Sequence, residues 1–434
     1  MAQRAIREYD GKALFSKVWD SYFGDAFNYA FKSVLVTSGN DLNEKAKENA
    51  WLKSDALVAK PDMLFGKRGV NGLVQFKVSK PGDVKLADSV KWIDEKSKDV
   101  TTLKSGQSGK LTHFVVEPFV PHEQSQEYYI CATTGDETDS LFLSAHGGIE
   151  VEENWDKVTE IKIPVDATDA AIADLIKKNI PSDVADKARF GEFAVRFYNF
   201  FRDMHFAYLE INPIVMVENN VYLLDLVARV DDTAGYLMAK NWGDMEYPTA
   251  FGMAELSPEE KAIKSADEKS GASLKLTILN PKGRVWTMVA GGGASVVYAD
   301  TIADLIGVNE LSNYGEYSGN PTTDETRFYA ETVIDLMTRE KHVGGQGKIL
   351  LIGGAIANFT DVAKTFTGII QAFEKMADKM KAVGTKIYVR RGGPNYEIGL
   401  KNIKAAAEKL GLPIEVYGPE THVTDIVRMA LESK

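Results

Sequence analysis

Residues 272–434 alternate regularly between short apolar runs and longer amphipathic segments, and this alternation constrains the fold more than any other feature. The apolar runs are rich in Val, Ile and Leu, which is typical of strands buried on both faces of a parallel sheet. Because parallel strands need a crossover between them, the pattern predicts an α/β domain with a doubly wound parallel sheet. The predicted strands cover residues 274–279, 284–289, 348–352, 386–390 and 414–417, with another near Leu311. The predicted helices cover residues 295–306, 324–339, 359–380, 396–410 and the end of the chain.

Residues 1–245 have a different pattern, in which several short strands follow one another directly. Together with a long helical pattern over residues 183–204, this predicts an α+β domain. Residues 246–271 begin with a stretch that loses periodicity and carries two prolines, which favours a connection between residues 1–245 and the domain over residues 272–434. The strand candidates of the first domain are residues 56–60, 72–78, 113–119, 127–133, 139–143, 207–211, 214–217 and 221–226.

Composition excludes several classes of protein. The 434 residues are 44% hydrophobic, which is enough for two or three domain cores, and the formal net charge is −11. No basic run stands out, so neither nucleic acid nor an anionic membrane surface is an expected partner. No stretch reaches the roughly 18 apolar residues of a spanning helix, and the N-terminus has no apolar signal core. The one cysteine, Cys131, excludes an intrachain disulfide framework, so we expect a cytoplasmic protein.

Glycine-rich turns follow several predicted strands of the C-terminal domain. After the strand that ends near Ile352, Gly353 and Gly354 permit a sharp turn and close approach to a ligand. Asn358 is a candidate helix N-cap, with Asp361 three residues later. Free N–H groups at such a helix start favour an anion. Taken alone, the turn is equally compatible with an ordinary strand–helix junction.

Three further turns strengthen the prediction of an anion site. The stretch VRRGGPNY ends a strand with Arg390 and Arg391, whose guanidinium groups suit a carboxylate or phosphate, although a surface ion pair is the alternative. The stretch NYGEYSG places Ser318 and Gly319 in a loop after the preceding strand, and VAGGGASVVYAD supplies a fourth glycine turn. Because ligands bind at the carboxyl ends of strands in such sheets, these turns predict a pocket for a polyanion.

The N-terminal domain contains elements that suit a nucleotide. Lys60 comes at a strand end and is followed by a basic glycine loop, an arrangement compatible with phosphate binding or with a solvated hairpin. The stretch EPFVPHEQSQEYYI offers backbone groups at Pro118 and Val120 to an adenine edge and Glu127 to ribose hydroxyls; a proline-broken strand pair is the alternative. Asn212 and Asp225 lie in an expected hairpin and are oxygen ligands that suit Mg²⁺, unless they form an Asx turn and an exposed carboxylate.

The histidines show no metal-ligand spacing. His146 stands beside two glycines in SAHGGIE, where a phosphoryl acceptor and a turn residue are both conceivable, and the turn residue is favoured. The other histidines are His113, His122, His205, His342 and His422.

These motifs resemble those of the ATP-citrate lyase family over nearly the whole chain and in the family's order. The chain is similar to the small subunit of the two-chain enzymes and to the N-terminal part of the single-chain ones, and more distantly to the β subunit of succinyl-CoA synthetase. The specific stretches are VAKPDMLFGKRG, VVEPFVPH, LEINP, LNPKGRVWTMVAGGGASVVYAD, NYGEYSG, IGGAIANFTDVA and VRRGGPNYEIGL. The resemblance implies an ATP-grasp domain followed by a flavodoxin-like domain. The departures lie mostly in loops such as KHVGGQGK.

The resemblance also implies roles for individual residues. The phosphates of ATP are expected at Lys60, Arg68 and Gly69, the adenine at Pro118 and Val120, and the ribose at Glu127. The metal ligands are expected to be Asn212 and Asp225, with a further metal contact through Asp267, Ser270 and the Ala272 carbonyl. Citrate is expected at Gly319, Asn358, Phe359, Thr360 and Arg391.

The reaction implied by the family converts citrate, ATP and CoA to acetyl-CoA, oxaloacetate, ADP and phosphate through a phosphohistidine and citryl phosphate. In the family that histidine belongs to a CoA-binding module, which no stretch of this sequence matches. We therefore expect no catalytic residue of that kind here and a larger partner subunit in a hetero-oligomer. Two alternatives are a succinyl-CoA synthetase-like ligase subunit and a non-catalytic subunit that binds citrate or nucleotide.

Overall fold

The computed structural model describes residues 3–148, 151, 155–253 and 256–432. The chain forms two compact units, Met1–Ala254 and Glu255–Lys434. Among the described residues, no helix combines the length and the apolar character that crossing a membrane requires.

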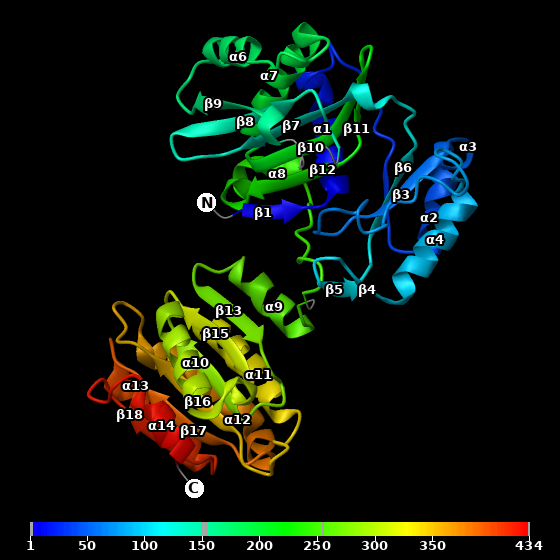
Figure 1. Ribbon diagram of the computed structural model, residues 1–434. Helices are drawn as coiled ribbons and strands as arrows, with labels where there is room; N and C mark the ends of the chain where they lie inside the picture. Colours follow the sequence, from blue (N-terminus) through cyan, green and yellow to red (C-terminus); the bar gives the residue numbers. More distant parts are fainter. Residues whose placement is uncertain (1–2, 149–150, 152–154, 254–255, 433–434) are drawn as a thin grey trace. The chain divides into compact units, whose positions relative to one another are not determined.

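A seven-stranded antiparallel sheet organises the first unit, in the order β1-β12-β10-β7-β8-β9 with β11 added beside β10 (Figure 1). Its strands are β1 (Gln3–Ile6), β7 (Glu127–Thr133), β8 (Thr138–Ser144), β9 (Thr159–Pro164), β10 (Phe206–Val217), β11 (Asn220–Leu223) and β12 (Leu226–Asp231). Its helices are α1 (Glu8–Tyr22), α6 (Asp169–Lys178), α7 (Lys187–Asp203) and α8 (Gly235–Trp242).

Helix α7 supplies much of the aromatic core under this sheet. Its phenylalanines recur every three or four residues and therefore face one side, where Phe193, Phe197 and Phe200 are fully buried. Phe15 of α1 packs on Phe200 with ring centroids 4.1 Å apart. Burying so many aromatic side chains fixes α1 and α7 against one face of the sheet.

A smaller lobe of the first unit contains the antiparallel sheet β2-β6-β3, which lies beside α2 and α4 in Figure 1. Leu57, Ala59, Phe114 and Val116 alternate along β3 and β6 into one apolar cluster, as a half-covered sheet requires. The elements of this lobe are β2 (Val34–Val36), α2 (Gly39–Glu48), α3 (Trp51–Ser54), β3 (Leu57–Pro61), α4 (Leu86–Lys98), β4 (Val100–Thr102), β5 (Ser108–Lys110) and β6 (Phe114–Pro118).

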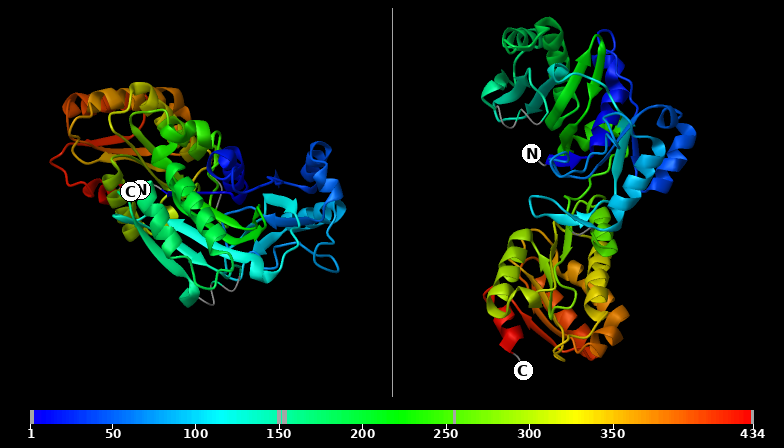
Figure 2. Two further views of the ribbon diagram at one scale, coloured as in Figure 1. Left: turned by 90° about the horizontal axis from the view of Figure 1, so that it is seen from above. Right: turned by 45° about the vertical axis from the view of Figure 1, so that its right-hand side comes forward.

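The second unit contains a four-stranded parallel sheet in the order β14-β16-β17-β18. Alternate residues of its strands enter two separate cores: Leu350 and Ile352 of β16 face one, and Ile349 and Leu351 face the other. Helices α11, α12 and α13 cover the first face, and α10 and α14 cover the second. Seen from above in Figure 2, the orange helices run along one side of the strands and the red helix lies on the other. The doubly wound arrangement is thus confirmed.

The elements of the second unit are α9 (Pro258–Asp267), β13 (Ser273–Ile278), β14 (Val285–Ala290), α10 (Gly292–Ile306), β15 (Asn313–Ser318), α11 (Thr323–Thr338), β16 (Ile349–Gly354), α12 (Val362–Ala382), β17 (Lys386–Arg390), α13 (Tyr396–Lys409), β18 (Ile414–Tyr417) and α14 (Asp425–Glu432). Short 3-10 helices lie at Gln124–Gln126, Trp155–Lys157, Asp232–Ala234 and Val308–Glu310.

The structure corrects several local predictions. Residues 72–78 are not a strand, since Gln75 makes only an isolated bridge to Ala59. The strand predicted near Leu311 is β15 (Asn313–Ser318), which pairs antiparallel with β13, so Ser318 ends this strand and does not lie in the loop after it. Residues 246–271 contain helix α9, which is started by a capping box between Ser257 and Glu260 and buries Ile263. The strand predicted over residues 221–226 ends at Leu223, and β12 begins at Leu226.

Candidate functional site

The first unit contains a cavity of about 610 Å³. Residues from both lobes of the unit line it: the β3 side and the loop after it, the end of β6, and the β10–β12 region. Seven of the nucleotide and metal contacts expected from the sequence lie in these separate segments, and the fold brings them together around the cavity. They are Lys60, Arg68, Gly69, Pro118, Val120, Asn212 and Asp225.

Basic groups gather at one end of the cavity. Lys60, near the end of β3, contacts Glu8 through its Nζ at 2.6 Å and also donates to the Leu224 carbonyl. Arg68 donates to the Pro61 carbonyl at 3.0 Å and pairs with Asp225. Apart from its chain neighbours, Gly69 has no atom of the described residues within 4 Å of where its Cβ would be, which leaves space beside its backbone for a ligand. This end of the cavity suits phosphate groups.

The charges at this end are strongly coupled. Burial by itself would raise the pKa of Glu8, but Arg68, Lys12 and Lys60 together hold it well below its ordinary value. Burial would lower the pKa of Arg68, but Asp225 and Glu8 raise it above its ordinary value. All of these groups except Asp225 are nearly inaccessible to solvent, so their charges are little screened.

The connection between β6 and β7 forms another part of the cavity wall. Pro118 and Val120 line it, and so does His122. Among the described residues Glu127 does not line the cavity itself; its Oε1 lies 2.9 Å from Nε2 of His122. The Nδ1 of the same ring lies 2.7 Å from the Val120 carbonyl. His122 therefore links the expected adenine contact to the expected ribose contact.

The backbones of Asn212 and Asp225 lie side by side, although Asn212 lies within β10 and does not close a strand, and Asp225 lies between β11 and β12 and not in a hairpin strand. The Asn212 N–H donates to the Asp225 carbonyl at 3.0 Å, while the Asn212 Oδ1 accepts from the Gly148 N–H at 2.7 Å. The Asp225 side chain is 39% exposed, and its Oδ1 pairs with Arg68. One carboxylate oxygen and one amide oxygen at the edge of a phosphate-sized space fit a Mg²⁺ ion that also binds substrate oxygens.

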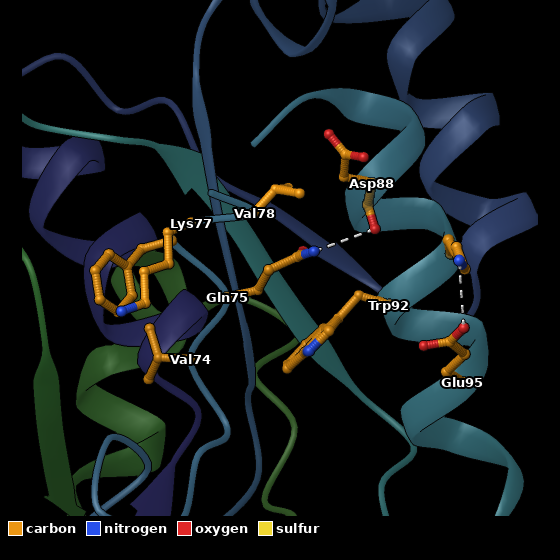
Figure 3. A pocket seen from close by; sticks show the side chains of 9 residues that line it. Val74, Gln75, Lys77, Val78, Asp88, Trp92 and Glu95 are labelled. Atoms are coloured by element: carbon orange, nitrogen blue, oxygen red, sulfur yellow. Dashed lines mark hydrogen bonds and ion pairs between the residues drawn. The ribbon is translucent and has the colours of Figure 1, made fainter. Parts of the chain in front are cut away.

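A shallower hollow of about 360 Å³ lies on the outside of residues 74–78. Figure 3 shows Trp92 and Gln75 facing one another across it, with the Gln75 amide donating to the Asp88 carbonyl at 3.2 Å. None of the residues expected to bind nucleotide, metal or citrate lines this hollow.

In the second unit, three glycine turns meet at the carboxyl ends of adjacent strands. Ala290 of β14 lies opposite Gly354 of β16, and Ile356 bridges to Gly392 after β17. Helix α10 begins directly after β14, with Gly291 at its N-cap and no side-chain cap. This is the edge at which the sequence predicted a polyanion pocket.

The two arginines of the VRRGG stretch have different environments. Arg390 donates to three backbone carbonyls, those of Thr421, Gly354 and Pro419, which occupy most of its guanidinium. Arg391 donates to the Ala355 carbonyl, is only 5% exposed, and forms no ion pair with any carboxylate in the described part of the chain. Burial lowers its pKa, and the nearby hydroxyls of Tyr317 and Tyr298 oppose this effect. A buried guanidinium without an acidic partner is suited to an external carboxylate.

The remaining expected citrate residues lie around the same edge. Asn358 and Phe359 are exposed in the turn after β16, and Thr360 is buried. Asn358 does not cap α12 as predicted; Asp361 does, accepting from the Lys364 N–H at 3.0 Å. Gly319 follows β15 with a φ of 74°, a conformation that favours glycine.

The loop between α9 and β13 carries the second expected metal contact. A Cβ on Gly319 would lie 3.3 Å from the Ala272 Cα, so this loop adjoins the expected citrate residue. Both carboxylate oxygens of Asp267 are taken by the chain itself, through the Leu274 N–H and Lys275. The Ser270 hydroxyl accepts from the Ala272 N–H at 2.9 Å. Within the described residues, no group of three or more His, Cys, Asp or Glu side chains is arranged to hold a metal.

Sequence reasoning did not find the roles of Glu8, Lys12 or His122. It also missed Glu117, which lines the cavity and accepts from the Lys12 Nζ at 2.8 Å. Glu8 and Lys12 are four residues apart on the same buried face of α1 as Phe15 and Trp19. An i,i+4 acid–base pair within an apolar helix face was the available signal, because a charged pair at such positions must find partners in the interior.

Comparison with known proteins also divides the chain into two regions. Residues 2–242 match the family model described as the ATP-citrate synthase ATP-grasp domain, and residues 254–433 match the ATP citrate lyase citrate-binding model. The ATP-citrate synthase alpha chain protein 1 of Arabidopsis thaliana is 46% identical over 100% of this chain and 99% of its own length. The ATP-citrate synthase of Mus musculus is 45% identical over 99% of this chain, but the match covers only 38% of the mouse protein.

A solved structure shares the whole fold. The ATP citrate lyase of Methanothrix soehngenii, determined in complex with citrate and coenzyme A, superposes with a TM-score of 0.87 at 46% identity and covers 100% of both chains. With two family models that together span nearly all residues, and full-length relatives above 40% identity, the chain belongs to the ATP-citrate lyase family.

Proposed function

We propose that this chain is the ATP- and citrate-binding subunit of an ATP-citrate lyase. The observation that carries the proposal is the gathering of Lys60, Arg68, Asn212 and Asp225 around one cavity of the ATP-grasp unit. It is supported by a second anion site in the citrate-binding unit, where Arg391 has no acidic partner among the described residues.

Each group has a physical role in this proposal. Lys60 and Arg68 bind the phosphates of ATP, and backbone groups at Pro118 and Val120 bind the adenine. Asn212 and Asp225 would hold Mg²⁺, which neutralises phosphate charge when bound. Arg391 binds a citrate carboxylate, while the turn from Asn358 to Thr360 and the Gly319 backbone surround the rest of the acid.

The chemistry requires activation of a carboxylate, because a carboxylate oxygen is a poor leaving group until it is phosphorylated. We propose that the chain completes this activation together with a larger partner subunit that carries a phosphorylated histidine, the CoA site and the cleavage module. The mouse relative is consistent with this, since more than half of its length lies outside the match. The hetero-oligomer and the cytoplasmic location stay predictions.

The test is calorimetric titration of the full chain with citrate, succinate and Mg·ATP. We expect citrate to bind much more tightly than succinate, and Arg391→Ala to weaken citrate binding by about tenfold or more, as for a charge-assisted hydrogen bond of about 1.5–3 kcal/mol. Arg339→Ala, which removes a half-exposed arginine of the same unit, is the matched control.

Either of two results would contradict the proposal. A preference for succinate would move the assignment to a succinyl-CoA synthetase-like subunit. Binding of citrate without any binding of Mg·ATP would favour a non-catalytic citrate-binding subunit.

A further inference from the structure

We propose that Glu8 is a positioning residue for the phosphate-binding side chains Lys60 and Arg68. The inference rests on the proposed function, in that it assumes that the cavity of the first unit takes Mg·ATP. Glu8 itself does not line the cavity in the described structure, so its role would be exerted through the two cations that do.

The carboxylate of Glu8 is surrounded by cations. The Nζ atoms of Lys12 and Lys60 each lie 2.6 Å from its Oε1, and the Nη2 of Arg68 lies 2.6 Å from its Oε2. Its side chain is only 2% exposed. Three cations this close together repel one another strongly in a poorly solvated site. Glu8 is the one carboxylate among the described residues that contacts all three, since Glu117 reaches only Lys12, at 2.8 Å, and Lys60, at 3.6 Å, and Asp225 pairs only with Arg68.

The position of Glu8 is itself set by the strand that carries Lys60. Asp62 follows β3 directly, and its two carboxylate oxygens accept from the Glu8 and Tyr9 N–H groups, each at 2.9 Å. These two hydrogen bonds hold the first turn of α1 against the end of β3, two residues after Lys60. The backbone of Glu8 is therefore held in place beside the phosphate end of the cavity.

Arg68 has two kinds of anionic partner. Glu8 is buried, whereas Asp225 is 39% exposed and is an expected metal ligand. Asp225 would be needed as a ligand when a metal is bound, which leaves Glu8 as the carboxylate partner of Arg68. Glu8 therefore keeps Lys60 and Arg68 at the phosphate end of the cavity.

The experiment compares Glu8→Gln, Glu8→Asp and the unmodified full chain by calorimetric titration with Mg·ATP, adenosine and citrate. For Glu8→Gln we expect the Kd of Mg·ATP to rise on the order of tenfold to a hundredfold, which is the size of one lost charge-assisted hydrogen bond to phosphate. Adenosine and citrate should bind as in the unmodified chain, because neither needs the two cations of this cluster. Glu8→Asp keeps the charge but shortens the reach, so it should be intermediate. Glu44→Gln, which breaks an exposed ion pair with Lys47 in the same unit, is the matched control.

Several outcomes would overturn the inference. Unchanged or tighter Mg·ATP binding in Glu8→Gln would show that Glu8 does not position the cations or competes with phosphate for them. An equal loss of adenosine and Mg·ATP binding would reveal a general structural role. If Glu8→Gln does not fold, Glu8→Asp carries the same comparison of Mg·ATP with adenosine. Failure of the unmodified chain to bind Mg·ATP would instead refute the proposed function, and this result is distinguishable because it does not depend on any variant.

Discussion

Charged side chains are concentrated in the interior around the start of α1, where each needs a specific partner. Beside the Glu8 cluster, Asp10 lies near Asp62 and Glu246, and one of its carboxylate oxygens has no hydrogen bond among the described residues. Buried charges of this kind contribute less to stability than apolar packing of the same volume. Their presence is explained more readily by ligand binding than by stability.

Asp10 makes the stability of the chain depend on pH. Burial, reinforced by Asp62, raises the pKa of Asp10 to about 6. Its pKa in the unfolded chain is lower, at about 3.9, so the neutral carboxyl stabilises the fold at low pH and this contribution is lost as the pH rises from about 4 to 6. We expect Asp10→Asn to increase the free energy of unfolding at pH 7.5, by at most about 3 kcal/mol, and to have no such effect at pH 4.

Urea denaturation at the two pH values measures this difference. Asp20→Asn, at an exposed position of the same helix, is the control. A gain of equal size at both pH values would show that the effect does not come from ionisation of Asp10.

His122 is expected to strengthen binding of the ribose hydroxyls by holding Glu127 in place. Each of its ring nitrogens lies within hydrogen-bond distance of an acceptor, the Val120 carbonyl or Glu127. Loss of the ring frees Glu127 to adopt other rotamers. We expect His122→Ala to weaken binding of Mg·ATP by roughly threefold to tenfold, the size of one lost hydrogen bond, and to leave binding of the 2′,3′-dideoxy analogue nearly unchanged. Competition titrations with the two nucleotides test this, and an equal loss for both would contradict it.

At the scale of elements, α7 shows how a periodic sequence determines packing. Its phenylalanines form one face, and Phe200 contacts both Phe15 of α1 and Phe206 of β10. We expect Phe200→Ala to destabilise the first unit by about 3–5 kcal/mol, because the cavity left between a helix and a sheet cannot close fully. Tyr236→Ala on α8, where the side chain is 93% exposed, should change stability by less than about 0.5 kcal/mol.

Chemical denaturation followed by circular dichroism measures both values. A loss for Phe200→Ala no larger than that for Tyr236→Ala would contradict the packing described for α7.

The strand ends of the second unit illustrate how elements create a site that no single element contains. Parallel pairing of β14, β16 and β17 brings three glycine turns to one edge, and the antiparallel pair β13-β15 adds Gly319 and the Ala272 loop. Glycine is favoured at Gly354, where an added Cβ would lie 2.8 Å from the Ala290 carbonyl oxygen and 2.5 Å from the Arg391 guanidinium. The close approach places Arg391 against the backbone of the neighbouring turn.

At the scale of the whole molecule, each unit has its own core and its own candidate ligand site. We expect Mg·ATP to slow hydrogen exchange of amides near the cavity in Met1–Ala254, and citrate to slow it at the strand ends of Glu255–Lys434. Saturation at about 100 times Kd corresponds to roughly 2.7 kcal/mol of stabilisation, which exchange experiments resolve readily.

Mass-spectrometric hydrogen exchange on the full chain measures both effects. Lys60→Met should abolish protection by the nucleotide and retain protection by citrate. Protection of the citrate edge by Mg·ATP alone would show that the nucleotide site had been assigned to the wrong unit.

The sequence by itself determined the order and kind of most elements. Alternation of apolar runs with amphipathic segments predicted the doubly wound sheet, since buried parallel strands and their covering helices each leave a local periodicity. Long specific motifs indicated the family and the approximate position of the candidate contacts. Prediction was weaker where a segment has no continuous strand partner. Residues 72–78 have a strand-like composition but form only isolated bridges, from Gln75 to Ala59 and from Lys77 to Pro81.

Tertiary structure decided what each charged group does, because its partners are distant in sequence. Glu8 and Lys60 are 52 residues apart, and no local pattern states that they meet. Arg390 and Arg391 look interchangeable in the sequence, yet the fold surrounds the first with carbonyls and leaves the second without an acidic partner among the described residues. Local periodicity reports which face of an element is buried, whereas the electrostatics of a site depend on which other elements are brought against that face.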